Sequence, residues 1–166
     1  QLANGGYEIK PRIIDDVYKL QPIINSWREK FMYKNNNSSL IPKNLKKLYR
    51  NQENIKFVLD ALYGATNEPM GTSYRSRFTK KEYIYAGKTG TSQIRTITEE
   101  ERRLKLKNKD MPYEKRDHAI FVAFAPYKNP RYAISVVIEH GGAGSSGAAP
   151  VAREVIRKVL ERDKLR

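Results

Sequence analysis

Residues 118–139 read HAIFVAFAPYKNPRYAISVVIE, which is two apolar runs on either side of a short polar turn. The runs at 118–126 and 131–139 are rich in β-branched and aromatic residues, which favour β-strands. The turn at 127–130 has a length that suits an antiparallel hairpin. Because nearly every position in both runs is apolar, we expect two neighbouring strands that are covered on both faces.

Further elements are expected on either side of this hairpin. Pro150 stands where a helix would start, and the apolar residues of 151–160 fall on one stripe opposite basic residues. Residues 53–64 also have helical spacing, with Gly64 expected to end that helix. Aromatic and β-branched residues predict a third strand over 83–97. The expected fold class is therefore α/β, of the α+β type: an antiparallel sheet flanked by helices.

The composition limits the function classes. The chain has 166 residues and a net charge of +14, which first suggests a nucleic-acid or anionic-membrane partner. The positive excess is spread along the chain, and no RNA-binding or helix-turn-helix motif accompanies it, so no nucleic-acid partner is expected. No run approaches the roughly 18 apolar residues of a transmembrane helix. The absence of cysteine excludes disulfides, thiolate metal sites and a cysteine nucleophile.

A charge-dense segment at 98–117 separates the third strand from the hairpin. It begins Thr98-Glu99-Glu100-Glu101, a pattern typical of a helix N-terminus. His118 and His140 flank the hairpin, and antiparallel pairing would bring them close together. A metal site needs a third ligand, so we expect a structural role for the two histidines and no metal or other cofactor.

The sharpest chemical motif is Lys88-Thr89-Gly90-Thr91. A phosphate-binding P-loop would need a glycine at position 82, where the chain has Glu82, and a helix directly afterwards. A strand is expected to continue there instead, so we reject the P-loop. The other interpretation is the Lys-Thr-Gly element of serine acyltransferases that bind penicillin. Gly90 would let a substrate peptide lie against the backbone, while Thr89 and Thr91 would offer hydroxyl groups to its carboxylate.

The sequence around this motif resembles the penicillin-binding protein 2 family, the class B transpeptidases of rod-shaped wall elongation. The stretches that carry the resemblance are 62–72, 86–93, 117–127 and 139–144, which read LYGATNEPMGT, AGKTGTSQ, DHAIFVAFAPY and EHGGAG. The opening stretch at 3–11, ANGGYEIKP, is similar to the same family. The resemblance covers about residues 1–16 and 53–162. Residues 19–52 do not match it clearly and are interpreted as a lineage-specific insertion.

The resemblance implies a partial penicillin-binding transpeptidase fold and a function in peptidoglycan cross-linking. Its substrates are stem peptides, joined through an acyl-serine intermediate, and β-lactams acylate the same serine. Lys88 is then the catalytic residue of this chain, and Thr89, Gly90 and Thr91 bind substrate. Neither a metal nor a cofactor is implied.

The chain departs from the family pattern in one respect. No serine is followed by lysine three residues on, or by asparagine two residues on, so both the nucleophile motif Ser-x-x-Lys and the motif Ser-x-Asn are missing. We therefore expect residues 1–166 to be the C-terminal portion of a transpeptidase domain, inactive alone. The resemblance places a membrane anchor upstream of this chain, the domain on the periplasmic face of the bacterial inner membrane, and elongation-machinery membrane proteins among its partners.

Two other function classes remain open from the sequence. The first is a basic binding module for nucleic acid or another anionic polymer, which the net charge would serve. The second is a non-catalytic scaffold domain of the wall machinery, which the missing nucleophile would allow. The residues upstream of Gln1 distinguish the scaffold from the enzyme, because an intact Ser-x-x-Lys favours the enzyme.

Overall fold

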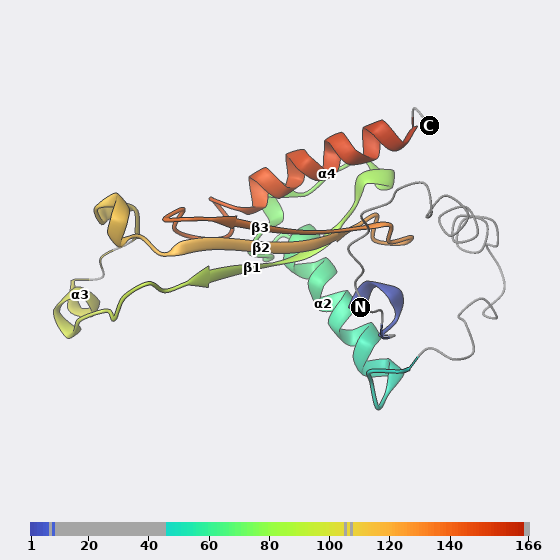
Figure 1. The fold of residues 1–166 in the computed structure, drawn as a ribbon, viewed down its shortest axis with the longest axis horizontal. Helices are drawn as coiled ribbons and strands as arrows, with labels where there is room; N and C mark the ends of the chain where they lie inside the picture. The colour runs from blue at the N-terminus through green and yellow to red at the C-terminus, as the bar shows by residue number, and fades with distance from the viewer. Residues whose placement is uncertain (7, 9–45, 105, 107, 165–166) are drawn as a thin grey trace, which may run out of the picture. The chain divides into compact units, whose positions relative to one another are not determined.

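The structure is a computed structural model that describes residues 1–6, 8, 46–104, 106 and 108–164 (Figure 1). The chain divides into two compact units, Gln1–Ile55 and Lys56–Arg166. Within the described ranges, no helix has both the length and the apolar character needed to cross a bilayer. Of the segment 19–52 that the sequence sets apart, residues 19–45 lie outside the described part.

In the first unit, the opening residues form a turn that pairs with a later segment. A short 3-10 helix spans Leu2–Asn4 and ends at Gly5, which has a φ of 85°. The backbone N–H of Leu48 donates to the carbonyl of Gly6 at 2.9 Å, and that of Glu8 donates to the carbonyl of Lys46 at 2.9 Å. These hydrogen bonds hold the start of the chain beside residues 46–48.

The second unit is built on a three-stranded antiparallel sheet. Its strands are β1 (Ala86–Ser92), β2 (His118–Ala125) and β3 (Tyr132–Ile138), in the order β1-β2-β3. Helix α4 (Ala149–Lys164) covers one face of this sheet (Figure 1). The expected class, an antiparallel sheet flanked by helices, is therefore confirmed.

The remaining helices connect and flank these strands. Helix α2 (Gln52–Asn67) begins at the end of the first unit and leads into the second. The short helix α3 (Glu99–Arg103) lies in the charge-dense segment between β1 and β2. Its predicted N-terminus is confirmed, because the Thr98 hydroxyl accepts from the Glu101 N–H while the Glu101 carboxylate accepts from the Thr98 N–H.

Two predicted boundaries are wrong. The third strand was expected over 83–97, but β1 stops at Ser92 because its partner in the register, His118, is the first residue of β2. At the other end, Tyr83 belongs to a 3-10 turn. Gly64 does not end helix α2, which continues to Asn67, and the Glu68 N–H still donates to the Gly64 carbonyl at 3.1 Å.

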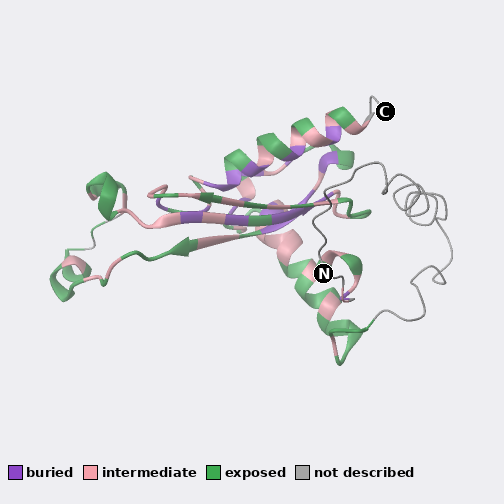
Figure 2. Ribbon diagram, in the orientation of Figure 1, coloured by how far each residue is buried: buried purple, intermediate pink, exposed green. Residues whose placement is uncertain are grey.

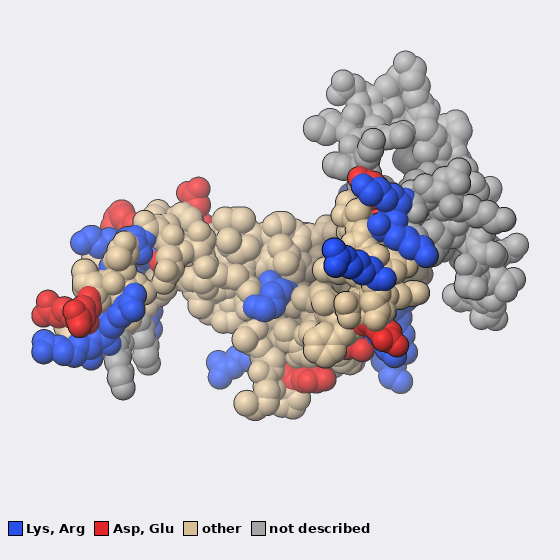
Figure 3. All heavy atoms as spheres, turned by 90° about the horizontal axis from the view of Figure 1, so that it is seen from below, with Lys and Arg blue, Asp and Glu red and all other residues tan. Residues whose placement is uncertain are grey.

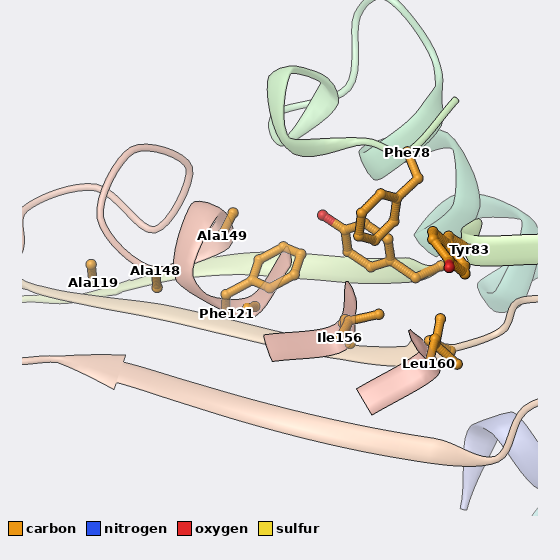
Figure 4. Packing of buried hydrophobic residues seen from close by; sticks show 12 residues of the cluster. Phe78, Tyr83, Ala119, Phe121, Ala148, Ala149, Ile156 and Leu160 are labelled. Carbon is orange, nitrogen blue, oxygen red and sulfur yellow. The ribbon is translucent and has the colours of Figure 1, made fainter. Parts of the chain in front are cut away.

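The core of the second unit lies between the sheet and α4 (Figure 2, Figure 4). Phe121 on β2 and Leu160 on α4 are almost completely buried, at 0% and 2% exposure. Alanines at the contact between the layers let the helix approach the sheet closely: Ala119, Ala148, Ala149 and Ala152. Tyr85 is also fully buried, and its hydroxyl donates to the Ser76 carbonyl at 2.9 Å, which satisfies the buried polar group.

The opposite face of the sheet is covered only in part, contrary to the expectation of strands buried on both faces. Phe124 on this face packs against Tyr127, whose ring in turn contacts Tyr63 of α2. Farther along the same face, Val122 is 46% exposed and Val137 is 56% exposed. Within the described residues of the second unit, the helix that packs over the sheet lies on the other side, so these valines face solvent.

The packing of α4 gives a stability prediction. Ile156 is 3% exposed and Val151 on the same helix is 43% exposed. We expect Ile156→Ala in the full-length protein to lower the free energy of unfolding by about 2–5 kcal/mol, because it opens a cavity in the core. The matched Val151→Ala should cost much less. Urea unfolding midpoints of the two variants check this, and equal midpoints would contradict the packing described here.

Candidate active site

The Lys88–Thr91 motif lies in the middle of β1, which is the edge strand of the sheet among the described residues. The register pairs Lys88 with Val122, Thr89 with Phe121, Gly90 with Ile120 and Thr91 with Ala119 in β2. On its other side β1 has no neighbouring strand in the order β1-β2-β3. A free edge of this kind offers backbone N–H and C=O groups to an extended peptide.

The side chains of the motif alternate between the two faces of the sheet. Lys88 shares a face with Val122, while Thr89 shares the other face with Phe121. Lys88 is exposed, and its Nζ donates to the carbonyl of Thr89 at 2.8 Å. Among the described residues Lys88 forms no ion pair with a carboxylate, so its charge is not neutralised by a neighbour.

Thr89 has a side-chain partner that the sequence analysis missed. The hydroxyl groups of Thr72 and Thr89 lie 3.1 Å apart, within hydrogen-bond distance. Thr72 belongs to the loop after α2, within a stretch that carries the family resemblance but that suggested no role for it. The sequence contains no signal for this contact. The stretch Gly71-Thr72-Ser73 has no hydrophobic periodicity, so nothing in it indicates that it packs beside β1.

The loop that carries Thr72 is fixed to the end of α2. Ser73 is 1% exposed, and both its N–H and its hydroxyl donate to the Ala65 carbonyl, at 3.0 and 2.9 Å. On the other side of Thr72, a Cβ at Gly71 would lie 2.6 Å from the Ala65 carbonyl oxygen. Only glycine permits this approach, because any side chain would collide with the helix backbone.

The end of α2 is in turn held against β1 and the residues before it. The Asn67 side-chain amide donates to the Tyr63 carbonyl at 3.0 Å and to the Tyr85 carbonyl at 2.9 Å. The buried hydroxyl of Thr66 lies 3.4 Å from the Gly87 carbonyl oxygen and 3.3 Å from that of Leu62, either of which can accept its proton. Thr72 therefore reaches Thr89 from a loop whose base is attached to the motif strand.

The glycine-rich loop after β3 lies against the backbone of the motif. Gly144 is buried, and a Cβ there would collide with the carbonyl oxygens of Gly90 and Ile120. The backbone of Gly144 therefore packs directly against the backbone of Gly90 and Ile120. The same loop contributes Ser145 and Ser146 to a groove of about 610 Å³, whose rim also includes Thr72.

The two histidines come together as predicted. Their ring centroids lie 5.0 Å apart, and the His140 N–H donates to His118 Nδ1 at 2.9 Å. His140 Nδ1 lies 3.1 Å from the Arg116 carbonyl oxygen, and Tyr113 packs on the His140 ring. Both histidines thus take part in backbone hydrogen bonds at the end of the sheet. Across the described ranges, no group of three or more His, Asp or Glu residues is arranged to hold a metal ion.

The segment between β1 and β2 is held by an ion pair. The Arg95 guanidinium donates to both carboxylate oxygens of Glu101, at 2.9 and 2.7 Å. This hydrogen bonding is the main reason that the pKa of Glu101 lies below its usual value. The ion pair joins the residues that follow β1 to helix α3, and it involves none of the motif residues.

Comparison with known proteins identifies the family of this chain. Residues 1–157 match the family described as penicillin binding protein transpeptidase domain. The chain therefore belongs to the penicillin-binding protein transpeptidase family.

The proteins similar to this chain include peptidoglycan D,D-transpeptidases named MrdA and solved structures of penicillin-binding protein 2 (PBP2). The peptidoglycan D,D-transpeptidase MrdA of Salmonella typhimurium is 40% identical over 104 residues, which are 63% of this chain and 16% of that protein. The Pseudomonas aeruginosa PBP2 structure in complex with WCK 5153 has a TM-score of 0.61 and 26% identity, covering 95% of this chain and 28% of that one. PBP2 from Helicobacter pylori, in its complex with MreC, has a TM-score of 0.56 and 30% identity, covering 75% and 20%.

The chain spans about one sixth of the length of the MrdA proteins that it matches. The fold is that of a transpeptidase domain. The matched regions represent only a part of the related proteins.

The contact at Gly144 gives a second stability prediction. We expect Gly144→Ala in the full-length protein to cost about 1–3 kcal/mol of unfolding free energy, because the new methyl group meets two carbonyl oxygens. Ala143→Ser, at an exposed neighbouring position, is the matched control and should have little effect. Chemical unfolding of both variants checks the difference. A Gly144→Ala variant as stable as the control would show that the loop does not depend on this contact.

Proposed function

We propose that residues 1–166 are the C-terminal portion of the transpeptidase domain of a peptidoglycan D,D-transpeptidase that cross-links stem peptides and binds penicillin. The observation that carries this proposal is the Lys88-Thr89-Gly90-Thr91 motif on the free edge of an antiparallel sheet. Family membership and the names of the MrdA relatives support it. In this proposal residues 19–52 are a lineage-specific insertion.

In the proposed reaction, a serine in the part of the protein outside this chain is the nucleophile, since the chain has no Ser-x-x-Lys. Its hydroxyl attacks the carbonyl carbon of the penultimate D-alanine of a stem peptide and loses its proton. The tetrahedral oxyanion then collapses, the peptide C–N bond breaks, and the terminal D-alanine leaves with a proton on its amine. The amino group of a second stem peptide attacks the acyl-serine, which forms the cross-link and restores the serine.

The residues of β1 have distinct roles in this scheme. The stem peptide extends along the strand edge, where Gly90 presents no side chain to obstruct it. The hydroxyl groups of Thr89 and Thr91 donate to the terminal carboxylate, and the Thr91 N–H contributes to the oxyanion hole. Lys88 is the catalytic residue of the chain, because its ammonium group adds positive charge beside the serine and the anionic substrate.

The location and partners belong to the same proposal. A membrane anchor upstream of this chain would hold the protein in the bacterial inner membrane, with the domain on the periplasmic face. Elongation-machinery membrane proteins would be its partners, and the MreC complex of the Helicobacter pylori relative supports this. The rest of the protein would cover the sheet face that carries the exposed Val122 and Val137.

The face shown in Figure 3 does not favour a nucleic-acid-binding module. On the face shown in Figure 3, Lys and Arg occur in separate groups that alternate with Asp, Glu and uncharged surface. A polymer-binding protein would be expected to present a continuous basic stripe. The scaffold alternative differs from the enzyme only in the residues upstream of Gln1, and acylation by penicillin distinguishes the two.

The assigned role of Lys88 can be tested in the full-length protein. We expect Lys88→Ala to lower the rate of acylation by labelled penicillin by about a hundredfold or more, because a preorganised charge next to the nucleophile is lost. Lys81→Ala is the matched control, since Lys81 is also exposed and lies outside the motif. Stopped-flow or gel-based labelling measures both rates. Unchanged acylation in Lys88→Ala would remove the role assigned to this residue.

The absence of the nucleophile gives a separate prediction. We expect the isolated 166-residue chain to form no covalent adduct with labelled penicillin, whereas the full-length protein should be labelled. Mass spectrometry of the intact chain after incubation provides the measurement. A stable adduct on a residue of this chain would contradict the claim that the nucleophile lies outside it.

A further inference from the structure

We propose that Thr72 is a positioning residue that sets the direction of the Thr89 hydroxyl for binding the substrate carboxylate. The inference rests on the proposed function, since it assumes that Thr89 contacts a carboxylate. The observation behind it is the 3.1 Å distance between the two hydroxyl oxygens, across a sequence separation of 17 residues. Among the described residues, Thr72 is the side-chain partner of Thr89.

The chemistry of two hydroxyl groups gives this contact a direction once a ligand binds. A threonine hydroxyl has a single proton to donate and lone pairs that accept. Without a ligand, either oxygen can be the donor in the Thr72–Thr89 bond. A carboxylate only accepts, so Thr89 must donate its proton to the ligand, and Thr72 must then donate to Thr89.

The resulting chain of hydrogen bonds runs from Thr72 to Thr89 to the carboxylate. Hydrogen bonds in series polarise one another, so the donor behind Thr89 strengthens the bond that Thr89 makes to an anion. It also restricts the Thr89 side chain to the orientation in which its proton points away from Thr72. Thr72 therefore reduces the conformational freedom that Thr89 loses on binding.

The rigid setting of Thr72 makes this role effective. Its neighbours Gly71 and Ser73 are both held against the end of α2, by close backbone packing and by two hydrogen bonds to the Ala65 carbonyl. The end of α2 is tied to the Tyr85 carbonyl by Asn67. A hydroxyl on a freely moving loop would lose more entropy in making the same bond.

The test is a double-mutant cycle in the full-length protein, with benzylpenicillin as the probe and the second-order acylation rate constant as the readout. We expect Thr72→Val to lower this constant by about threefold to tenfold, which corresponds to the loss of one hydrogen bond. Thr72→Ser should restore it to within about twofold. In the Thr89→Val background, Thr72→Val should have no further effect, because Thr72 acts through Thr89.

A second measurement separates positioning from a merely structural role. The methyl ester of benzylpenicillin lacks the anionic carboxylate, so Thr72→Val should change its acylation rate constant little. Thr79→Val, at an exposed threonine outside the site, is the matched control and should behave as wild type. The inference would be overturned if Thr72→Val lowered the acylation rate constants of the acid and the ester equally. It would also be overturned if the effects of Thr72→Val and Thr89→Val were additive, or if Thr72→Ser lowered the rate constant as much as Thr72→Val.

The outcomes also distinguish this inference from the proposed function. If the unmodified full-length protein is not acylated by benzylpenicillin, the proposed function fails. If it is acylated, and Thr72→Val is acylated at the same rate, the proposed function stands and the role of Thr72 is wrong.

Discussion

The antiparallel register between β1 and β2 is the constraint on which the rest of the site depends. It places Thr89 opposite Phe121, and this pairing puts the Thr89 side chain on the face that α4 covers while Lys88 lies on the other face. The two strands fit closely at this point, because a Cβ at Gly87 would lie 2.6 Å from the Phe121 ring. A slip of one residue would exchange the faces of Lys88, Thr89 and Thr91 and turn Lys88 toward the core.

Much of this arrangement was predictable from the sequence. Long apolar runs at 118–126 and 131–139 indicate two neighbouring strands, and the stripe after Pro150 indicates the helix that covers one of their faces. The strand over 83–97 was predicted from its aromatic and β-branched residues. Its Lys88–Thr91 motif was assigned because the stretches on both sides also resemble the transpeptidase family. Hydrophobic pattern and local motif thus predict the layers of the fold and the strand that carries the chemistry.

The features that were not predicted depend on contacts between segments that are not neighbours in the sequence. Strand β1 ends at Ser92 because its partner strand β2 begins at the paired residue, His118. The residue types at 93–97 do not indicate that the strand ends before them. The contact between Thr72 and Thr89 depends on the path of the loop after α2, and the sequence of that loop has no hydrophobic periodicity from which its path could be predicted. The exposure of Val137 follows from which elements of the chain pack on that face, and apolar character alone indicates only that the residue prefers to be covered.

The attachments between α2, its following loop and β1 have a consequence for the order of folding. The Thr66–Gly87, Asn67–Tyr85 and Thr72–Thr89 contacts all join residues that are 21 or fewer positions apart. Contacts of such short range lose little chain entropy on closure and form rapidly. During synthesis, residues 60–92 are added to the chain before any residue of β2. The loop that orients Thr89 can therefore begin to assemble on the motif strand ahead of the sheet that finally holds that strand in place.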